Sequence, residues 1–234
     1  MKTEIPEQYA EVFKEALMAL NIAKIPYVVG GAYAAWHYTG YCRYTHDLDL
    51  YLEKKWVEQA ANVLLQVGFL DYGETAAGDR EWIFHAIKNQ IMVDLIWESP
   101  NHLLSVDESF YKRGVEGTFL GIPVRFMPAD CLIWTKIFTV NRQRCDWPDI
   151  FRIIRSRPGN LDWDFLLSKL GENWQVLLSC IILYEWVYPA DADAVPHYVR
   201  KELLERLEKL EIPKEQPSRE IILDPWIYTR GVLI

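Results

Sequence analysis

Three aspartates lie in sequence patterns that would let them hold a divalent metal ion. Asp47 and Asp49 are separated by one leucine and followed by another, an alternation that predicts a β-strand. Side chains on a strand point to opposite faces in turn, so the two acids would share one face while the leucines enter the core. Asp94 is the one acid of the apolar run 91–96, where a buried carboxylate is costly unless it is paired or metal-bound. Because neighbouring carboxylates repel each other unless a cation lies between them, we predict that Asp47, Asp49 and Asp94 bind metal. In the alternative interpretation, Asp47 caps a turn and Asp94 pairs with a neighbouring arginine.

A pair of glycines precedes the first two acids. Gly30 and Gly31 follow the short apolar stretch 27–29, which is typical of a central strand, and precede the helical pattern 32–38. Glycine lets the backbone bend sharply and approach a ligand closely, and a helix beginning here would direct free N–H groups at an anion. We therefore predict that the glycine pair binds phosphate beside the metal site.

Taken together, the glycine pair and the Asp-apolar-Asp strand resemble the signature of the polymerase-β-like nucleotidyltransferase superfamily. The motif Arg43-x-Thr45-x-Asp47-Leu48-Asp49 resembles that of the bacterial branch that includes AbiEii-type toxins, and more loosely that of aminoglycoside and lincosamide nucleotidyltransferases. The resemblance covers about the first 155 residues. It implies an enzyme whose three acids are catalytic and whose Arg43 and Thr45 contact phosphate or metal-bound water.

The resemblance also implies the cofactors and partners. Two Mg²⁺ ions would be held by the three acids, one bringing in the phosphates of a nucleoside triphosphate and the other activating an acceptor hydroxyl. The acceptors of the superfamily include tRNA ends, protein hydroxyls and small antibiotics, and the residues do not choose among them. The toxin branch would add a cognate antitoxin as a partner.

Three further candidates lie in the second half of the chain. Lys136 stands in an apolar helical pattern, where a snorkelling lysine is the usual explanation, but the resemblance implies that it contacts the triphosphate. Asp146 would orient Lys136 or bind substrate, or would act only as a helix N-cap. Arg142 opens a run rich in arginine, which is either a solvated helix face or a wall facing phosphate.

The order of strand and helix patterns predicts an α+β fold. A mixed sheet flanked by helices, with hairpins at 88–90 and 120–121, would make a catalytic domain over residues 1–128. Helical patterns at about 129–140, 146–156, 162–170, 173–187 and 196–210 would make a helical domain over 129–210. An apolar tail, 211–234, would pack back on the body.

Composition sets limits on the class of protein. The 234 residues carry a formal net charge of −8, which argues against a protein that coats nucleic acid through a broad basic surface. The four cysteines have no zinc-like spacing, and no segment is apolar enough for a signal peptide or a membrane span. We therefore expect a cytoplasmic protein with reduced thiols.

Two hypotheses from other classes stay open. A non-catalytic protein that binds a nucleotide or a partner would keep the fold, although all three acids are present. A purely structural domain would bind no nucleotide at all.

Overall fold

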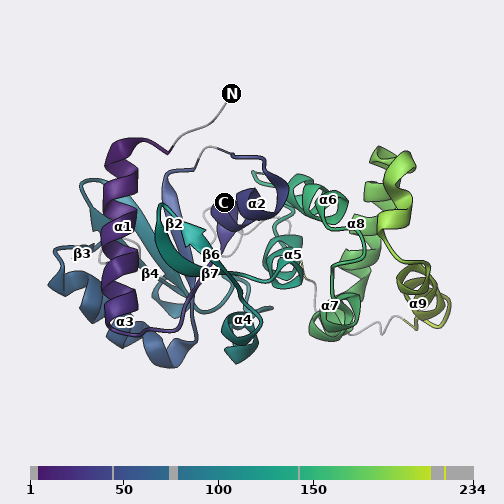
Figure 1. Ribbon diagram of the computed structural model, residues 1–234. Coiled ribbons are helices and arrows are strands. Elements are labelled where there is room, and N and C mark those ends of the chain that lie inside the picture. The colour runs from purple at the N-terminus through teal and green to yellow at the C-terminus, as the bar shows by residue number, and fades with distance from the viewer. Residues whose placement is uncertain (1–4, 44, 74–78, 142, 212–218, 220–234) are drawn as a thin grey trace. The chain divides into compact units, whose positions relative to one another are not determined.

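The computed structural model describes residues 5–43, 45–73, 79–141, 143–211 and 219. The chain forms two compact units, Met1–Pro128 and Ala129–Ile234 (Figure 1). Most of the predicted C-terminal tail, 211–234, lies outside the described residues.

A seven-stranded mixed sheet organises the first unit, with the strand order β3-β4-β5-β2-β1-β7-β6. Strands β2 and β5 are parallel neighbours, as are β1 and β7, and the other pairs are antiparallel. The strands are β1 (Val28–Val29), β2 (Asp47–Tyr51), β3 (Leu70–Asp71), β4 (Ile83–Lys88), β5 (Ile91–Ile96), β6 (Val115–Phe119) and β7 (Ile122–Phe126).

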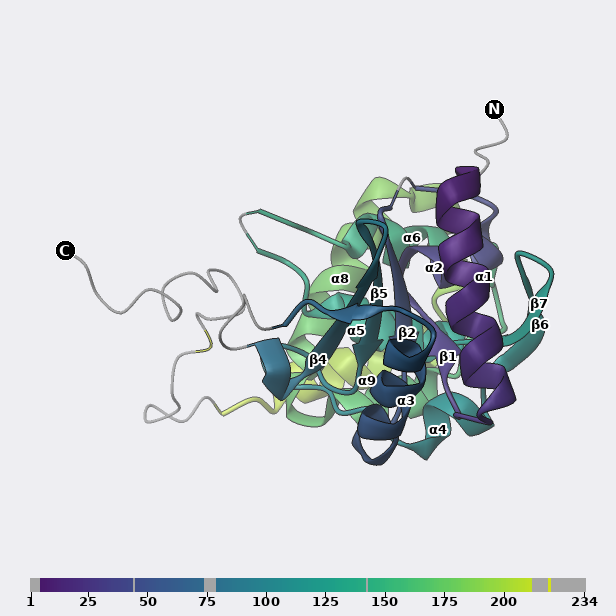
Figure 2. The ribbon, with the colours of Figure 1, turned by 90° about the vertical axis from the view of Figure 1, so that its left-hand side faces the viewer.

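The described residues of this unit form the α-helices α1 (Glu7–Ile22), α2 (Gly31–Thr39), α3 (Lys54–Gln66) and α4 (Glu108–Lys112), with a 3₁₀ turn, η1, at Asp79–Glu81. Helices α1 and α3 lie side by side and both pack on β5 (Figure 2). Their amphipathic spacing explains this placement. In α1, for example, Phe13, Leu17 and Leu20 recur every three or four residues and are fully buried.

Two tight hairpins fix the register of the sheet. Asn89 and Gln90 join β4 to β5, and Leu120 and Gly121 join β6 to β7, all four with positive φ between 52° and 80°. Two consecutive residues with positive φ make the type I′ turn whose twist matches that of paired strands. Both predicted hairpins are therefore present, and their two-residue turns determine which residues face each other across β4 and β5.

The second unit is helical. It contains α5 (Ala129–Ile137), α6 (Trp147–Ser156), α7 (Trp163–Leu170), α8 (Trp174–Val187) and α9 (His197–Glu208), with 3₁₀ turns η2 (Gly171–Asn173) and η3 (Pro189–Ala194). Helix α5 packs against α6, α7 and α8, and all but one of its nine residues are buried. A helix that is buried on nearly every side lies inside its unit, so α5 forms the centre of this unit.

One predicted boundary is wrong. The helical pattern over 129–140 predicts three more residues of helix than α5 has, because the chain turns away after Ile137. The N–H of Asp146 donates to the carbonyl of Thr139 at 2.9 Å, and Val140 and Cys145 form an isolated β-bridge. These contacts close a short loop that brings Asp146 back beside α5.

The predicted fold class is confirmed: a mixed sheet flanked by helices is followed by helices alone. Within the described part of the chain, no helix has the length and apolar character that crossing a membrane would require.

The two ends of α2 supply a test of how tightly its first turn packs on β2. A Cβ added to Gly31, where φ is +53°, would lie 1.7 Å from Oδ2 of Asp49. Gly40 ends the same helix with a φ of +66°, and an added Cβ there would meet nothing within 4 Å. We expect Gly40→Ala to cost only the left-handed backbone strain, about 1 kcal/mol, and Gly31→Ala to cost about 3 kcal/mol or more.

Urea denaturation of both variants in EDTA measures this difference in the free energy of unfolding. Equal losses in the two variants would show that α2 can move away from β2 and that the first turn is not tightly packed.

Candidate active site

The three predicted acids converge on one side of the sheet. Strands β2 and β5 run parallel with Asp49 directly opposite Asp94, and Asp47 lies two residues earlier on β2. Carboxylate oxygens from all three lie within 4.8 Å of one another. The intervening Leu48 and Leu50 are fully buried on the other face, as the alternation predicts. An all-oxygen donor set of this kind is what Mg²⁺ and similar hard cations prefer, so the residues fit such an ion.

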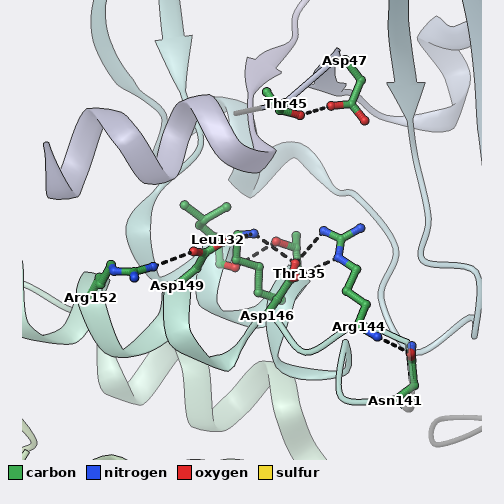
Figure 3. Close-up of polar contacts among 10 residues, drawn as sticks. Thr45, Asp47, Leu132, Thr135, Asn141, Arg144, Asp146, Asp149 and Arg152 are labelled. Atoms are coloured by element: carbon green, nitrogen blue, oxygen red, sulfur yellow. Dashed lines mark hydrogen bonds and ion pairs between the residues drawn. The ribbon is translucent and has the colours of Figure 1, made fainter. Parts of the chain in front are cut away.

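Each acid is held by a different neighbour. The hydroxyl of Thr45 donates to Oδ1 of Asp47 (Figure 3). The first turn of α2 lies against Asp49, since only a residue without a Cβ fits at Gly31. A hydrogen bond of 2.7 Å joins Nδ1 of His85 to Oδ1 of Asp94. Hydrogen bonds therefore orient Asp47 and Asp94, and the close packing of α2 confines Asp49.

His85 is a site residue that the sequence interpretation missed. It lies on β4 directly opposite Asp94, and the two side chains are 17% and 9% exposed. The partner that pairs with Asp94 across the hairpin is a histidine, whereas the alternative interpretation expected an arginine. The signal was present in the sequence, because a two-residue turn at Asn89–Gln90 places residue 85 opposite residue 94.

The glycine pair packs closely against β2. The N–H of Gly30 donates to the carbonyl of Asp49 at 2.9 Å, and a Cβ on Gly30 would lie 2.5 Å from the ring of Tyr51. Helix α2 begins at Gly31, so the positive end of its dipole lies beside the carboxylate of Asp49. Both glycines therefore have a steric reason to be there, and their predicted contact with phosphate stays a prediction.

Tyr33, two residues further along α2, senses the negative charge of the site. Burial raises the pKa of its hydroxyl well above the usual range, and Cys42, Asp47 and Asp49 raise it further. The tyrosine accordingly stays protonated at neutral pH, and its pKa responds to the potential that the acids create.

The residues predicted around Asp47 are placed only in part. Arg43 is exposed and Thr45 is half-buried. Arg142 lies outside the described residues, so its predicted contact with phosphate stays a prediction.

Lys136 and Asp146 belong to a charged cluster inside the second unit. The Lys136 ammonium lies 3.1 Å from Oδ2 of Asp146 and 3.0 Å from Oδ2 of Asp149, and its side chain is 4% exposed. Arg144 binds Asp146 through two nitrogens at 2.8 and 2.7 Å, and Arg152 reaches Asp149 (Figure 3). The snorkelling explanation of Lys136 is therefore wrong, because its charged end is buried and paired.

Asp146 occupies the N-cap position of α6, but its side chain makes no capping hydrogen bond there. The helix-cap alternative is wrong, and orientation of Lys136 by Asp146 is the alternative that the contacts favour. Burial raises the pKa of this carboxyl, but hydrogen bonds and charges from Arg144 and Lys136 outweigh burial and leave the pKa below its usual value.

Comparison with known families agrees with this geometry. Residues 9–176 match the family described as "Nucleotidyl transferase of unknown function (DUF2204)". The matched region covers most of the chain and includes the three acids and the cluster around Lys136. The chain therefore belongs to this nucleotidyl transferase family.

Solved structures with a similar arrangement are distant in sequence. The antibiotic-resistance factor ANT(2'')-Ia is 16% identical, with 80% of this chain and 96% of that chain covered and a TM-score of 0.47. JHP933 from Helicobacter pylori is 13% identical over 88% and 97% of the two chains, with a TM-score of 0.43. The lincosamide antibiotic adenylyltransferase LnuA is 11% identical over 61% and 94%, with a TM-score of 0.44. No curated protein sequence matches the chain.

The charged cluster of the second unit predicts a dependence of stability on pH. Because the pKa of Asp146 is lower in the folded chain than in the unfolded chain, its ionisation stabilises the fold above the unfolded value of about 3.9. This contribution is lost as the pH falls from there through the lower folded pKa. We expect Asp146→Asn to cost about 3 kcal/mol at pH 7, because Lys136 loses part of a buried pair. The difference from wild type should shrink as the pH falls below about 4.

Urea denaturation of wild type and variant from pH 7 down to pH 3 measures the effect. Glu202→Gln is the control, since the half-buried i,i+4 pair of Glu202 with Arg206 contributes about 0.5 kcal/mol or less. A loss for Asp146→Asn that stays constant across this pH range would contradict the assignment.

Proposed function

We propose that this chain is a metal-dependent nucleotidyltransferase, which moves a nucleoside monophosphate from a nucleoside triphosphate to an acceptor hydroxyl. The observation that carries the proposal is the convergence of Asp47, Asp49 and Asp94 within 4.8 Å in a chain of a nucleotidyl transferase family. Three carboxylates so close together destabilise the fold unless a cation shares the site. A structural role alone does not account for that placement.

The proposed chemistry is an in-line displacement at the α-phosphorus. A bond forms between the acceptor oxygen and the α-phosphorus, the bond from that phosphorus to the bridging oxygen breaks, and pyrophosphate leaves with the electron pair. The hydroxyl proton passes to a carboxylate of the site. When bound, two Mg²⁺ ions would neutralise phosphate charge and lower the pKa of the acceptor hydroxyl.

The residues of the chain position the reactants in this proposal. Asp47, Asp49 and Asp94 hold the metal, and the N–H groups at the start of α2, near Gly30 and Gly31, contact phosphate. Positioning and charge neutralisation supply most of the catalysis, as in phosphoryl transfer generally.

Lys136, Asp146, Arg43, Thr45 and Arg142 are further residues that we propose contact the nucleotide. The Lys136 ammonium already contacts two carboxylates, so a triphosphate would have to replace at least one of those contacts. A triphosphate carries enough negative charge to do so, and Asp146 would then orient the released ammonium.

The motif at residues 43–49 resembles that of the bacterial branch that includes AbiEii-type toxins, and more loosely that of antibiotic nucleotidyltransferases, and this resemblance supports membership of that branch. The acceptor is accordingly a tRNA, a protein hydroxyl or an aminoglycoside-like small molecule, and a toxin would have a cognate antitoxin. The experiment below separates these classes by the molecule that becomes labelled.

The test of activity is transfer of label from each α-³²P nucleoside triphosphate into a cell extract with Mg²⁺. We expect label on one class of molecule, identified by its sensitivity to ribonuclease or protease or by its small size. Asp49→Asn should lower the transfer by about 100-fold or more, because a charge that stabilises the transition state through the metal is lost.

Asp71→Asn is the matched control. Asp71 lies on β3, outside the acid cluster, and its carboxylate pairs with Arg80 at a distance of 2.7 Å. Transfer that persists in Asp49→Asn would show that the catalytic residues are assigned wrongly. The absence of transfer from every nucleotide in the wild type would overturn the enzymatic proposal.

Binding separates the non-catalytic alternative from both other classes. A nucleotide at a hundred times its Kd should add about 2.7 kcal/mol to the free energy of unfolding, in the presence of Mg²⁺. Stabilisation without transfer would favour a nucleotide-binding protein that keeps the fold. No stabilisation by any nucleotide would favour a structural domain.

A further inference from the structure

We infer that His85 is a positioning residue, which holds Asp94 in the orientation that metal binding requires. The inference rests on the proposed function and adds a residue to its machinery. Its basis is the pairing of His85 with Asp94 across the antiparallel strands β4 and β5, with Nδ1 and Oδ1 2.7 Å apart.

The chemistry of the two groups determines which atom carries the hydrogen of this hydrogen bond. A carboxylate that ligates a metal is ionised and only accepts hydrogen bonds, so in that state Nδ1 of His85 carries the hydrogen and donates it to Asp94. A neutral imidazole with its proton on Nδ1 and a charged imidazolium both present this donor. The contact therefore forms in either charge state of the ring.

One such hydrogen bond restricts how the carboxylate of Asp94 can rotate. Side chains that ligate metals are commonly oriented by an outer partner, whose loss costs about 10- to 100-fold in metal affinity or activity. Asp47 has a partner of this kind in Thr45, and the turn at Gly31 restricts Asp49 by contact. His85 thus restricts the orientation of Asp94, as Thr45 and the turn at Gly31 do for Asp47 and Asp49.

The location of the pair distinguishes positioning from a purely structural role. A purely structural histidine–aspartate pair could lie at any position in the core. This pair lies at the acid cluster, because Asp94 has an oxygen within 4.8 Å of oxygens of Asp47 and Asp49. If His85 instead replaced the metal as the neutralising cation, its removal would make the site more negative and strengthen metal binding. The two roles thus predict opposite changes.

Three variants separate these roles. His85→Leu removes the donor at a similar volume, and His85→Asn keeps an N–H group near the position of Nδ1. His102→Leu is the matched control, because the exposed His102 contacts Glu98 at 3.0 Å outside the acid cluster. Denaturation in EDTA establishes that each variant folds.

The readout is binding of Mn²⁺, used as a probe for Mg²⁺ and measured by electron paramagnetic resonance without turnover. We expect His85→Leu to raise the Kd for Mn²⁺ by about tenfold or more. His85→Asn should restore most of the affinity, and His102→Leu should bind as the wild type does. In the transfer assay, kcat should fall in His85→Leu and recover in His85→Asn.

The outcomes distinguish this inference from the proposed function. Wild-type affinity in His85→Leu, or tighter binding, would overturn the positioning role while leaving the enzyme assignment intact. If His85→Leu does not fold, His85→Phe, which also lacks a donor, takes its place: wild-type or tighter Mn²⁺ binding overturns the role, and a tenfold loss that His85→Asn restores supports it. If the wild type and Asp49→Asn bind Mn²⁺ equally weakly, the proposed function itself fails and the positioning role fails with it.

Discussion

The mutual repulsion of three carboxylates is the constraint on which the structure of the first unit depends. Asp49 and Asp94 lie opposite each other on parallel neighbouring strands, and Asp47 shares their face. Negative charges this close lower the stability of the folded chain unless other groups offset them. The hydroxyl of Thr45, the start of α2 and the imidazole of His85 each contact one of the acids. These contacts supply hydrogen bonds and a helix dipole, and a divalent cation completes the proposed site.

The glycine pair shows how the same residues can satisfy two demands. Its predicted purpose was to let the backbone approach a phosphate, but the structure gives a nearer reason. Side chains at Gly30 and Gly31 would collide with Tyr51 and Asp49 of the adjacent strand. A helix that must begin this close to a carboxylate also places its free N–H groups beside the acid cluster. The packing requirement and the proposed phosphate contact therefore follow from one backbone position.

Local patterns were enough to predict most strands of the sheet and the three acids, because strand alternation and tight turns act over a few residues; the strand order and β3 were not predicted. The positions of Leu48 and Leu50 and both hairpins follow from such patterns. His85 was missed because its role depends on register across a hairpin, which must be counted outward from the turn. The pairing of Lys136 was harder still. It depends on a loop that ends α5 at Ile137 and returns Asp146 to it, which the helical period over 129–140 conceals.

The cluster in the second unit has the opposite electrostatic character to the acids. Lys136, Arg144 and Arg152 contribute three positive charges, and Asp146 and Asp149 contribute two negative ones, so the cluster keeps one net positive charge. Burying an ammonium is costly unless carboxylates lie close to it, and two of them contact Lys136. The same carboxylates compete with a bound nucleotide for the ammonium of Lys136. An anion gains from Lys136 only if its charge exceeds that of the carboxylate it displaces, which a triphosphate satisfies and a neutral acceptor does not. A charged cluster that is both structural and functional would therefore favour the nucleotide over the acceptor.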